Sequence, residues 1–179
     1  MVTNYGYIEN FVQDDQLEKW KVMYKKVSTG EQYHESLAWG IFQNLSNKST
    51  KNHLGFKLFT KEIIPMIQAL LPANTKYNFS SFNRMFGPLP IHKDTAPNDD
   101  CTPGKSIIFP YSVDGDRTNF KGASTRIYDQ DKNLVETLIW KPNMLLWLQG
   151  DLYHDSGDFT NFDYKEFFMT QTYLENSKL

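Results

Sequence analysis

The sequence predicts an α+β protein that is mainly β, with N-terminal helices packed on one face of an antiparallel sandwich or barrel. Two observations carry this prediction. Up to about residue 73, apolar side chains recur at spacings of three and four, the pattern of amphipathic helices. From Asn74 onward, the chain consists of short aromatic or β-branched runs separated by Gly, Pro, Asn and Asp. A helical support region is therefore followed by a strand-rich core.

The length of the chain predicts one domain. With 179 residues, the chain can bury close to 70% of the surface of its unfolded form, so its core needs no covalent support. No linker, repeat or low-complexity segment divides it. We expect a single domain over residues 1–179, with helical support at about 1–73 and a β core at 74–179. Cys101 is the only cysteine, which excludes an intrachain disulfide and favours a reducing, cytoplasmic location.

The charge and hydropathy of the chain argue against two classes of partner. The formal net charge is −2 at pH 7, which gives no overall attraction to nucleic acid or to an anionic membrane. No apolar run approaches the 18 or more residues of a membrane span, and no basic segment followed by an apolar one begins the chain. We expect no nucleic-acid partner and no association with a membrane.

Three helices are expected in the N-terminal part. The first covers residues 14–27, where two aspartates precede apolar residues at helical spacing. The second covers residues 31–45 and the third residues 54–71, in which Pro65 should kink or restart the helix. Residues 1–11 carry a short aromatic pattern that fits an edge strand or a lead-in.

Six later runs have the composition and length of strands. They cover residues 77–86, 105–113, 124–128, 136–140, 144–148 and 166–174. Strands at such close spacing favour antiparallel pairing. A rolled-up double sheet of this kind would bring the beginning and the end of the strand set side by side.

His92 and Asp94 form a His-x-Asp pair on an expected strand. In extended backbone, residues i and i+2 project from one face, so both side chains would point to one place. His154 follows the run at 144–148 after a short turn and is the expected third ligand. Two histidines and one carboxylate on one side of an ion leave the opposite positions open, as in non-haem Fe(II) enzymes. Zinc is the competing metal, and a plain core or loop histidine is the alternative for His154.

Lys165 opens the last expected strand. By alternation it shares a face with Phe167 and Met169. If that face is the apolar interior, Lys165 is a cation at its mouth and needs a partner, for which an anionic ligand is suitable. The alternative is exposure to solvent beside Glu166.

The order of these residues resembles a known family. His92-Lys93-Asp94, then His154, then Lys165 is similar to the His-x-Asp…His…Arg/Lys pattern of Fe(II)- and 2-oxoglutarate-dependent oxygenases, particularly the prolyl 4-hydroxylase-like branch. The resemblance covers about residues 77–174, and three further segments are similar to strands of that branch: 106–111, 121–128 and 142–148. It implies a double-stranded β-helix core of the jelly-roll or cupin type.

The resemblance also implies cofactors and an activity. His92, Asp94 and His154 would bind Fe(II), and Lys165 would pair with the distal carboxylate of 2-oxoglutarate. The enzyme would use dioxygen to hydroxylate a protein side chain or a small amino-acid-like substrate, and 2-oxoglutarate would become succinate. The substrate is thus a peptide or a small molecule.

Two features depart from the pattern of the family. In the strand similar to its Gly-Gly-x-Thr segment, Gly122 is followed by Ala123 in place of the second glycine, which costs little because the position needs a small residue. Relatives often carry a tyrosine that donates a hydrogen bond to 2-oxoglutarate shortly before the His-x-Asp pair, where this chain has Met85 and Phe86. Asn83 and Tyr111 are the candidates for that role. Two other functions stay open: a cupin-type metal enzyme that does not use 2-oxoglutarate, and a catalytically silent β-sandwich binding module in which the three ligand residues do not converge.

Overall fold

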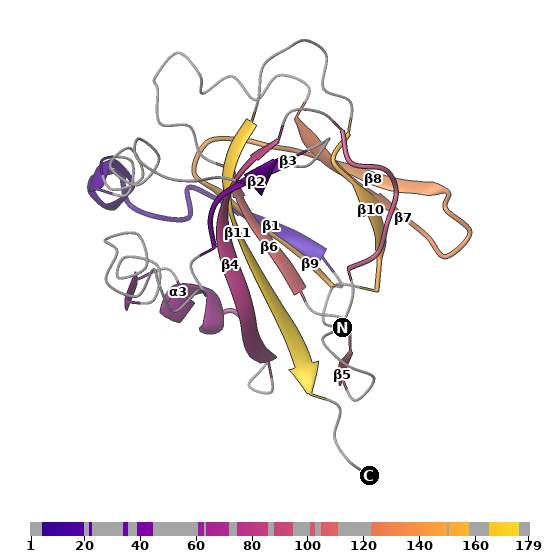
Figure 1. Cartoon of the computed structure of the whole chain (residues 1–179), viewed down its shortest axis with the longest axis horizontal. Helices are drawn as coiled ribbons and strands as arrows, with labels where there is room; N and C mark the ends of the chain where they lie inside the picture. The colour runs from indigo at the N-terminus through magenta and orange to yellow at the C-terminus, as the bar shows by residue number, and fades with distance from the viewer. Residues whose placement is uncertain are drawn as a thin grey trace.

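The computed structural model shows a chain that is mainly β, with its strands paired antiparallel in two sheets (Figure 1). This confirms the predicted class, while closure of the sheets into a double-stranded β-helix stays a prediction.

Within the described residues, no helix has the length and apolar character needed to cross a membrane. The structure describes residues 5–19, 22, 34–35, 39–44, 61–62, 64–71, 75–85, 88–94, 101–102, 105–110, 123–149, 151–157 and 165–175.

The large sheet has eight strands and lies at the centre of the molecule (Figure 1). Its order is β1-β9-β6-β11-β4-β3-β2, and β5 pairs with the end of β11. The strands are β1 (Tyr5–Glu9), β2 (His34–Glu35), β3 (Trp39–Asn44), β4 (Thr75–Met85), β5 (Cys101–Thr102), β6 (Lys105–Pro110), β9 (Met144–Gln149) and β11 (Lys165–Glu175). All six predicted strand runs therefore contain a strand, either in this sheet or in the small sheet. Near the N-terminus, where an edge strand or a lead-in is expected, β1 ends the order of the large sheet.

The small sheet has three strands in the order β10-β7-β8. They are β7 (Ser124–Tyr128), β8 (Leu134–Ile139) and β10 (Tyr153–Asp155). In Figure 1 this sheet lies on one side of the large sheet, and the helix α3 (Ile64–Gln68) lies on the other.

Strand β9 shows how these layers are held together. Its even-numbered residues join a buried cluster with the small sheet, whose members are Ala123, Ile127, Leu138, Trp140, Met144, Leu146 and Leu148. Its odd-numbered residues Leu145 and Trp147 face the other way and line a cavity of about 100 Å³ with Ile67 of α3. A strand covered on both faces has a continuous apolar sequence, which is why Met-Leu-Leu-Trp-Leu shows no alternation.

The prediction of a helix over residues 31–45 is wrong, because β2 and β3 occupy part of this range. β3 pairs with the eleven-residue strand β4, from Trp39 opposite Met85 to Asn44 opposite Ser81. The apolar residues at every fourth position imitate a helix, but Trp, Ile and Phe suit a pleated surface and β4 supplies the hydrogen bonds.

The other two helical predictions are met within the described residues. Residues 14–19 are helical, and the N–H of Leu17 donates to the carbonyl oxygen of Gln13 at 2.9 Å. In the range 54–71, α3 begins next to Pro65. Proline suits the first turn of a helix, because it lacks only an N–H that would have no partner there. Residues 20–21, 23–27, 54–60 and 63 of these two predictions lie outside the described part.

Candidate metal centre

His92 and His154 lie opposite each other on adjacent segments. The backbone N–H of each residue donates to the carbonyl oxygen of the other, both at 2.9 Å. A third bond joins the same segments, from the N–H of Leu89 to Oγ of Ser156 at 2.6 Å. The predicted meeting of distant parts of the chain is therefore confirmed. Residues 88–94, here called the ligand arm, contain only this isolated bridge, so the expected strand at the His-x-Asp pair is absent.

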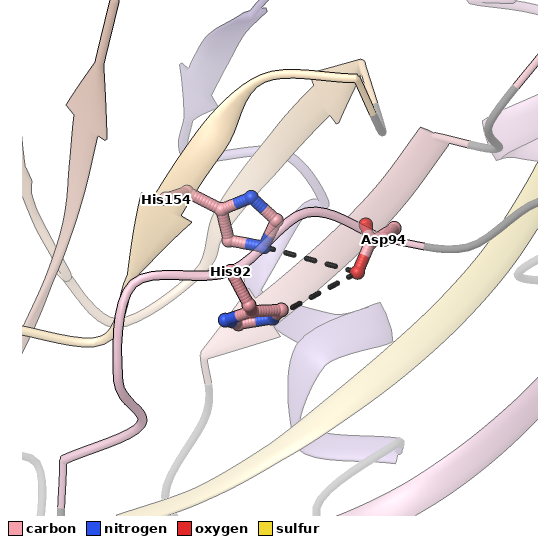
Figure 2. A group of neighbouring side chains, drawn as sticks. All are labelled: His92, Asp94 and His154. Carbon is pink, nitrogen blue, oxygen red and sulfur yellow. Dashed lines mark ion pairs between the residues drawn. The ribbon is translucent and has the colours of Figure 1, made fainter. Parts of the chain in front are cut away.

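The three predicted ligand side chains converge, as Figure 2 shows. Oδ1 of Asp94 lies 4.0 Å from Nε2 of His92 and 3.8 Å from Nε2 of His154. One ligand atom from each residue lies within 4.8 Å of the others. With metal–ligand bonds of about 2.0 to 2.2 Å, neighbouring ligand atoms of one ion lie roughly 2.8 to 3.6 Å apart. The three atoms thus need to move closer together, by about 1 Å, to bind one ion.

Both histidines are oriented by the backbone carbonyls that precede them. Nδ1 of His92 lies 2.9 Å from the carbonyl oxygen of Pro90, and Nδ1 of His154 lies 3.0 Å from that of Leu152. A carbonyl oxygen only accepts hydrogen bonds, so each Nδ1 carries a proton and donates it. In a neutral imidazole, Nε2 then has the free lone pair. These are the two nitrogen atoms that face Asp94, as in metal sites where a carbonyl fixes the ring of a ligand.

Burial favours the neutral form of His154. Its side chain is 7% exposed, that of Asp94 is 10% exposed and that of His92 is 37% exposed. Burial lowers the pKa of His154 below the usual value for histidine, although the negative charge of Asp94 acts in the opposite direction. A neutral imidazole can bind a metal without first releasing a proton. Solvent reaches the site from the side of His92.

The chemistry of the donor set fits a divalent cation. In this tautomer, the two Nε2 atoms and Oδ1 of Asp94 are all hydrogen-bond acceptors, and Oδ1 lies 4.0 and 3.8 Å from the two Nε2 atoms. A cation between them would convert this repulsive arrangement into a favourable one. Two histidines and one carboxylate are the donor set of non-haem Fe(II) sites. Within the described segments, no other group of three metal-ligating side chains is this close.

Asp155, directly after His154, belongs to a buried polar cluster that the sequence did not predict. Its carboxylate accepts hydrogen bonds from the Arg126 guanidinium, the Tyr128 hydroxyl and the N–H of Gly157, all of 2.7 to 3.1 Å. Burial opposes ionisation of Asp155, but these donors outweigh it and lower the pKa of its carboxyl. The only local signal was the pair of donors at Arg126 and Tyr128, which alternate on one strand.

Two of the other predicted site residues, Lys165 and Asn83, lie in the large sheet. Lys165 is the first residue of β11 and pairs with Met85 of β4. Asn83 pairs with Phe167, two residues further along the same two strands. The two backbone positions are therefore neighbours at the centre of the sheet. Tyr111 lies outside the described residues, so its predicted role stays a prediction.

Comparisons with known proteins identify the fold. No protein-family model and no curated protein matches the sequence. Solved structures do match. A 2OG-Fe(II) oxygenase family oxidoreductase from Burkholderia pseudomallei superposes with a TM-score of 0.70 at 10% identity, over 97% of this chain and 85% of that one. A Pseudomonas putida prolyl-4-hydroxylase gives 0.59 at 11%, over 98% and 94%.

A third structure broadens the range of chemistry found on this fold. The non-haem alpha ketoglutarate dependent carbocyclase SnoK from nogalamycin biosynthesis superposes with a TM-score of 0.65 at 10% identity, over 96% of this chain and 79% of that one. Identities this low establish a shared fold. The chain therefore has the fold of 2-oxoglutarate and Fe(II) oxygenases, prolyl 4-hydroxylases among them.

Proposed function

We propose that the chain is an Fe(II)- and 2-oxoglutarate-dependent oxygenase. It uses dioxygen to hydroxylate a protein side chain or a small amino-acid-like substrate: one oxygen atom enters the substrate, and the other enters the succinate that forms from 2-oxoglutarate with release of carbon dioxide. The observation that carries the proposal is the convergence of His92, Asp94 and His154, with one ligand atom of each within 4.8 Å of the others. The fold supports it, because structures that share the fold are named as a 2OG-Fe(II) oxygenase family oxidoreductase and as an alpha ketoglutarate dependent carbocyclase.

Each of the three side chains has a defined task in this proposal. Nε2 of His92, Oδ1 of Asp94 and Nε2 of His154 would hold the ion, a donor set that leaves further coordination positions for a co-substrate. Iron with bound 2-oxoglutarate supplies the oxidising chemistry. The carbonyl oxygens of Pro90 and Leu152 keep both imidazoles in the tautomer that binds metal. Burial of His154 and Asp94 limits the access of water from their side.

The co-substrate needs an anionic anchor site, for which we propose Lys165. Its ammonium group would pair with the distal carboxylate of 2-oxoglutarate. Asn83 and Tyr111 are the proposed hydrogen-bond donors to the same molecule. In support, the backbone register places Lys165 and Asn83 within two residues of each other on β11 and β4. The proposed core is a double-stranded β-helix, which the buried cluster between the two sheets supports.

An anaerobic titration with Fe(II) and then 2-oxoglutarate tests the proposal. We expect a weak visible charge-transfer band in the wild type and no band in His92→Ala. Lys165→Ala should require more 2-oxoglutarate for the same band. Lys141→Ala is the matched control, because Lys141 is an exposed lysine paired with Glu9 at the edge of the molecule, and its titration should equal that of the wild type.

The same titration separates the alternatives. Iron binding without a band at saturating 2-oxoglutarate would contradict the proposal and favour a cupin-type metal enzyme. No binding of a divalent ion would favour a silent binding module. To identify the substrate, the enzyme is incubated in air with peptides or with free amino acids, and the succinate formed is measured. The correct class of substrate should increase succinate formation, and the mass of the substrate should increase by one oxygen atom.

A further inference from the structure

We propose that the Arg126–Asp155 ion pair, completed by Tyr128, positions His154 for metal binding. These three residues are here called the Asp155 clamp. The inference rests on the proposed function in one respect only, the assignment of an ion to His92, Asp94 and His154. Asp155 is then a positioning residue, because it acts through His154.

The clamp is a dense set of strong contacts on one carboxylate. Nε of Arg126 donates to Oδ1 at 2.8 Å and to Oδ2 at 3.1 Å, and Nη2 donates to Oδ2 at 2.8 Å. The Tyr128 hydroxyl donates to Oδ2 at 2.7 Å, and the N–H of Gly157 donates to Oδ1 at 2.8 Å. A two-pronged hydrogen bond between guanidinium and carboxylate is strong and fixes orientation as well as distance.

Within the described residues, strand β10, which carries His154, has only short backbone pairings. It has three residues, and they pair with β7 at Tyr153 opposite Tyr128, His154 opposite Ile127 and Asp155 opposite Arg126. On its other side, β10 has the isolated bridge to the ligand arm. A ladder this short leaves the position of the strand weakly fixed. The clamp joins the same two strands through side chains, at the residue next to the ligand.

The clamp contacts the strand from behind the site. Neighbouring residues of a strand point to opposite faces, so Asp155 points away from the face of His154. Arg126 and Tyr128 share the face of Asp155, whereas Ile127 lies opposite His154 and belongs to the buried core cluster. His154 therefore lies on a strand that packing fixes on one face and the clamp fixes on the other, and no member of the clamp needs to contact the ion.

The residues after Asp155 extend this support to the ligand arm. Gly157 has φ of +66°, and a Cβ atom there would overlap Oγ of Ser124, so the turn that aims its N–H at Asp155 depends on glycine. Ser156, between them, accepts the hydrogen bond from Leu89 of the arm. Displacement of Asp155 would thus disturb the position of His92 and Asp94 as well as that of His154.

Titration of the metal-free protein with Co(II), without 2-oxoglutarate, tests the inference. Residues behind metal ligands typically change metal affinity by 10- to 100-fold. We expect Kd for Co(II) to rise by about this factor in Asp155→Asn and in Arg126→Gln. The visible absorption bands of bound Co(II) should also shift, because the geometry at His154 changes. Glu9→Gln, which breaks the exposed pair with Lys141, is the matched control and should leave Kd and bands unchanged.

Folding is measured separately, by circular dichroism and thermal unfolding. Asp155→Asn leaves Arg126 without its carboxylate and can prevent folding. The double variant Arg126→Gln/Asp155→Asn reduces this problem, because it keeps polar side chains and removes both charges of the ion pair. Tyr128→Phe is the mildest variant, since it removes one hydrogen bond. Both should bind Co(II) more weakly than the wild type, and the double variant should lose less affinity than the sum of the two single losses.

The outcomes separate this inference from the proposed function. A folded double variant with the Kd and the absorption bands of the wild type would overturn the inference, since the clamp would then serve stability alone. Weaker Co(II) binding with shifted bands supports it, even if 2-oxoglutarate gives no charge-transfer band and the oxygenase proposal fails. A wild type that binds no Co(II) overturns both.

Discussion

Two ion pairs in this molecule join segments that are far apart in the sequence, and they differ mainly in burial. The Asp155 clamp joins β7 to β10, with side-chain exposures of 28% for Arg126 and 3% for Asp155. At the other contact, Lys141 pairs with Glu9 of β1 at 2.6 Å, with exposures of 55% and 42%. Solvent screens the attraction between Lys141 and Glu9. The Arg126–Asp155 pair has lost much of its hydration, so it depends on hydrogen bonds from neighbouring protein groups. The length of an ion pair therefore does not predict its contribution to the free energy of unfolding unless the burial of both side chains is known.

The two contacts also differ in what lies next to them. The clamp is adjacent in sequence to a proposed metal ligand. The Lys141–Glu9 pair borders a shallow cavity of about 200 Å³ between β1 and β8, where Tyr5 also donates to Glu136 at 2.7 Å. Among the described strands, β1 is the last strand at one end of the large sheet and β8 is the last strand at one end of the small sheet. We therefore expect changes at the clamp to affect stability and the site together, and changes at the β1–β8 edge to affect neither.

The largest effect is expected at Arg126. Arg126→Met leaves the Asp155 carboxylate buried without its ion-pair partner and should lower the free energy of unfolding by about 3 kcal/mol. Urea denaturation followed by circular dichroism measures this loss. A loss below about 1 kcal/mol, the size of an exposed pair, would remove the distinction between the two contacts.

A neutral buried contact should have an intermediate effect. The Asn143 side chain accepts the N–H of Val12 at 3.1 Å and donates to its carbonyl oxygen at 2.8 Å, both buried. Asn143→Ala leaves both groups without partners and should cost about 1 to 3 kcal/mol in urea denaturation. Asn143 also has φ of +55°, so Asn143→Gly is the control. Wild-type stability in the glycine variant would assign the effect to backbone strain instead.

The turn between β7 and β8 gives a smaller, pH-dependent effect. Hydrogen bonds from the side chain and the backbone of Asn133 to Asp129 lower the pKa of the Asp129 carboxyl. Since the folded pKa lies below the unfolded value, this stabilisation is complete above about pH 4 and is lost as the pH falls through the folded pKa. The difference in melting temperature between wild type and Asp129→Ala should therefore shrink below pH 4. A difference independent of pH would contradict the assignment.

The smallest effect is expected at Glu9. Glu9→Gln removes the charge from an exposed pair and should leave the melting temperature unchanged within error, in low and in high salt. A decrease as large as that of Asn143→Ala would show that the β1–β8 edge is part of the stabilising core, contrary to its exposure.

The sequence predicted the parts of the fold that depend on local pattern. The run at 124–128 has the same limits as β7, and the run at 144–148 differs from β9 by one residue. Turn residues and apolar content mark such strands locally. The failure at 31–45 has the opposite cause, because β3 depends on pairing with β4, which is distant in the sequence. Local spacing carries no information about such a partner.

The candidate site divides in the same way. His92, Asp94 and His154 were found because their types and order match a known pattern, and the structure brings them together. Asp155 was missed, because its contact with Arg126 depends on the register of β10 against β7. A carboxylate beside a histidine ligand gives no sign of its partner until that register is known.

The central claim is that one ion is held by His92, Asp94 and His154, through Nε2 of both histidines. Nitrogen-15 NMR of the histidine side chains tests it most directly. In the metal-free protein, His92 and His154 should both carry the proton on Nδ1, and one equivalent of Zn(II) should shift both Nε2 signals while those of His34 and His53 stay in place. A proton on Nε2 of either ligand, or a shift at only one of them, would contradict the claim.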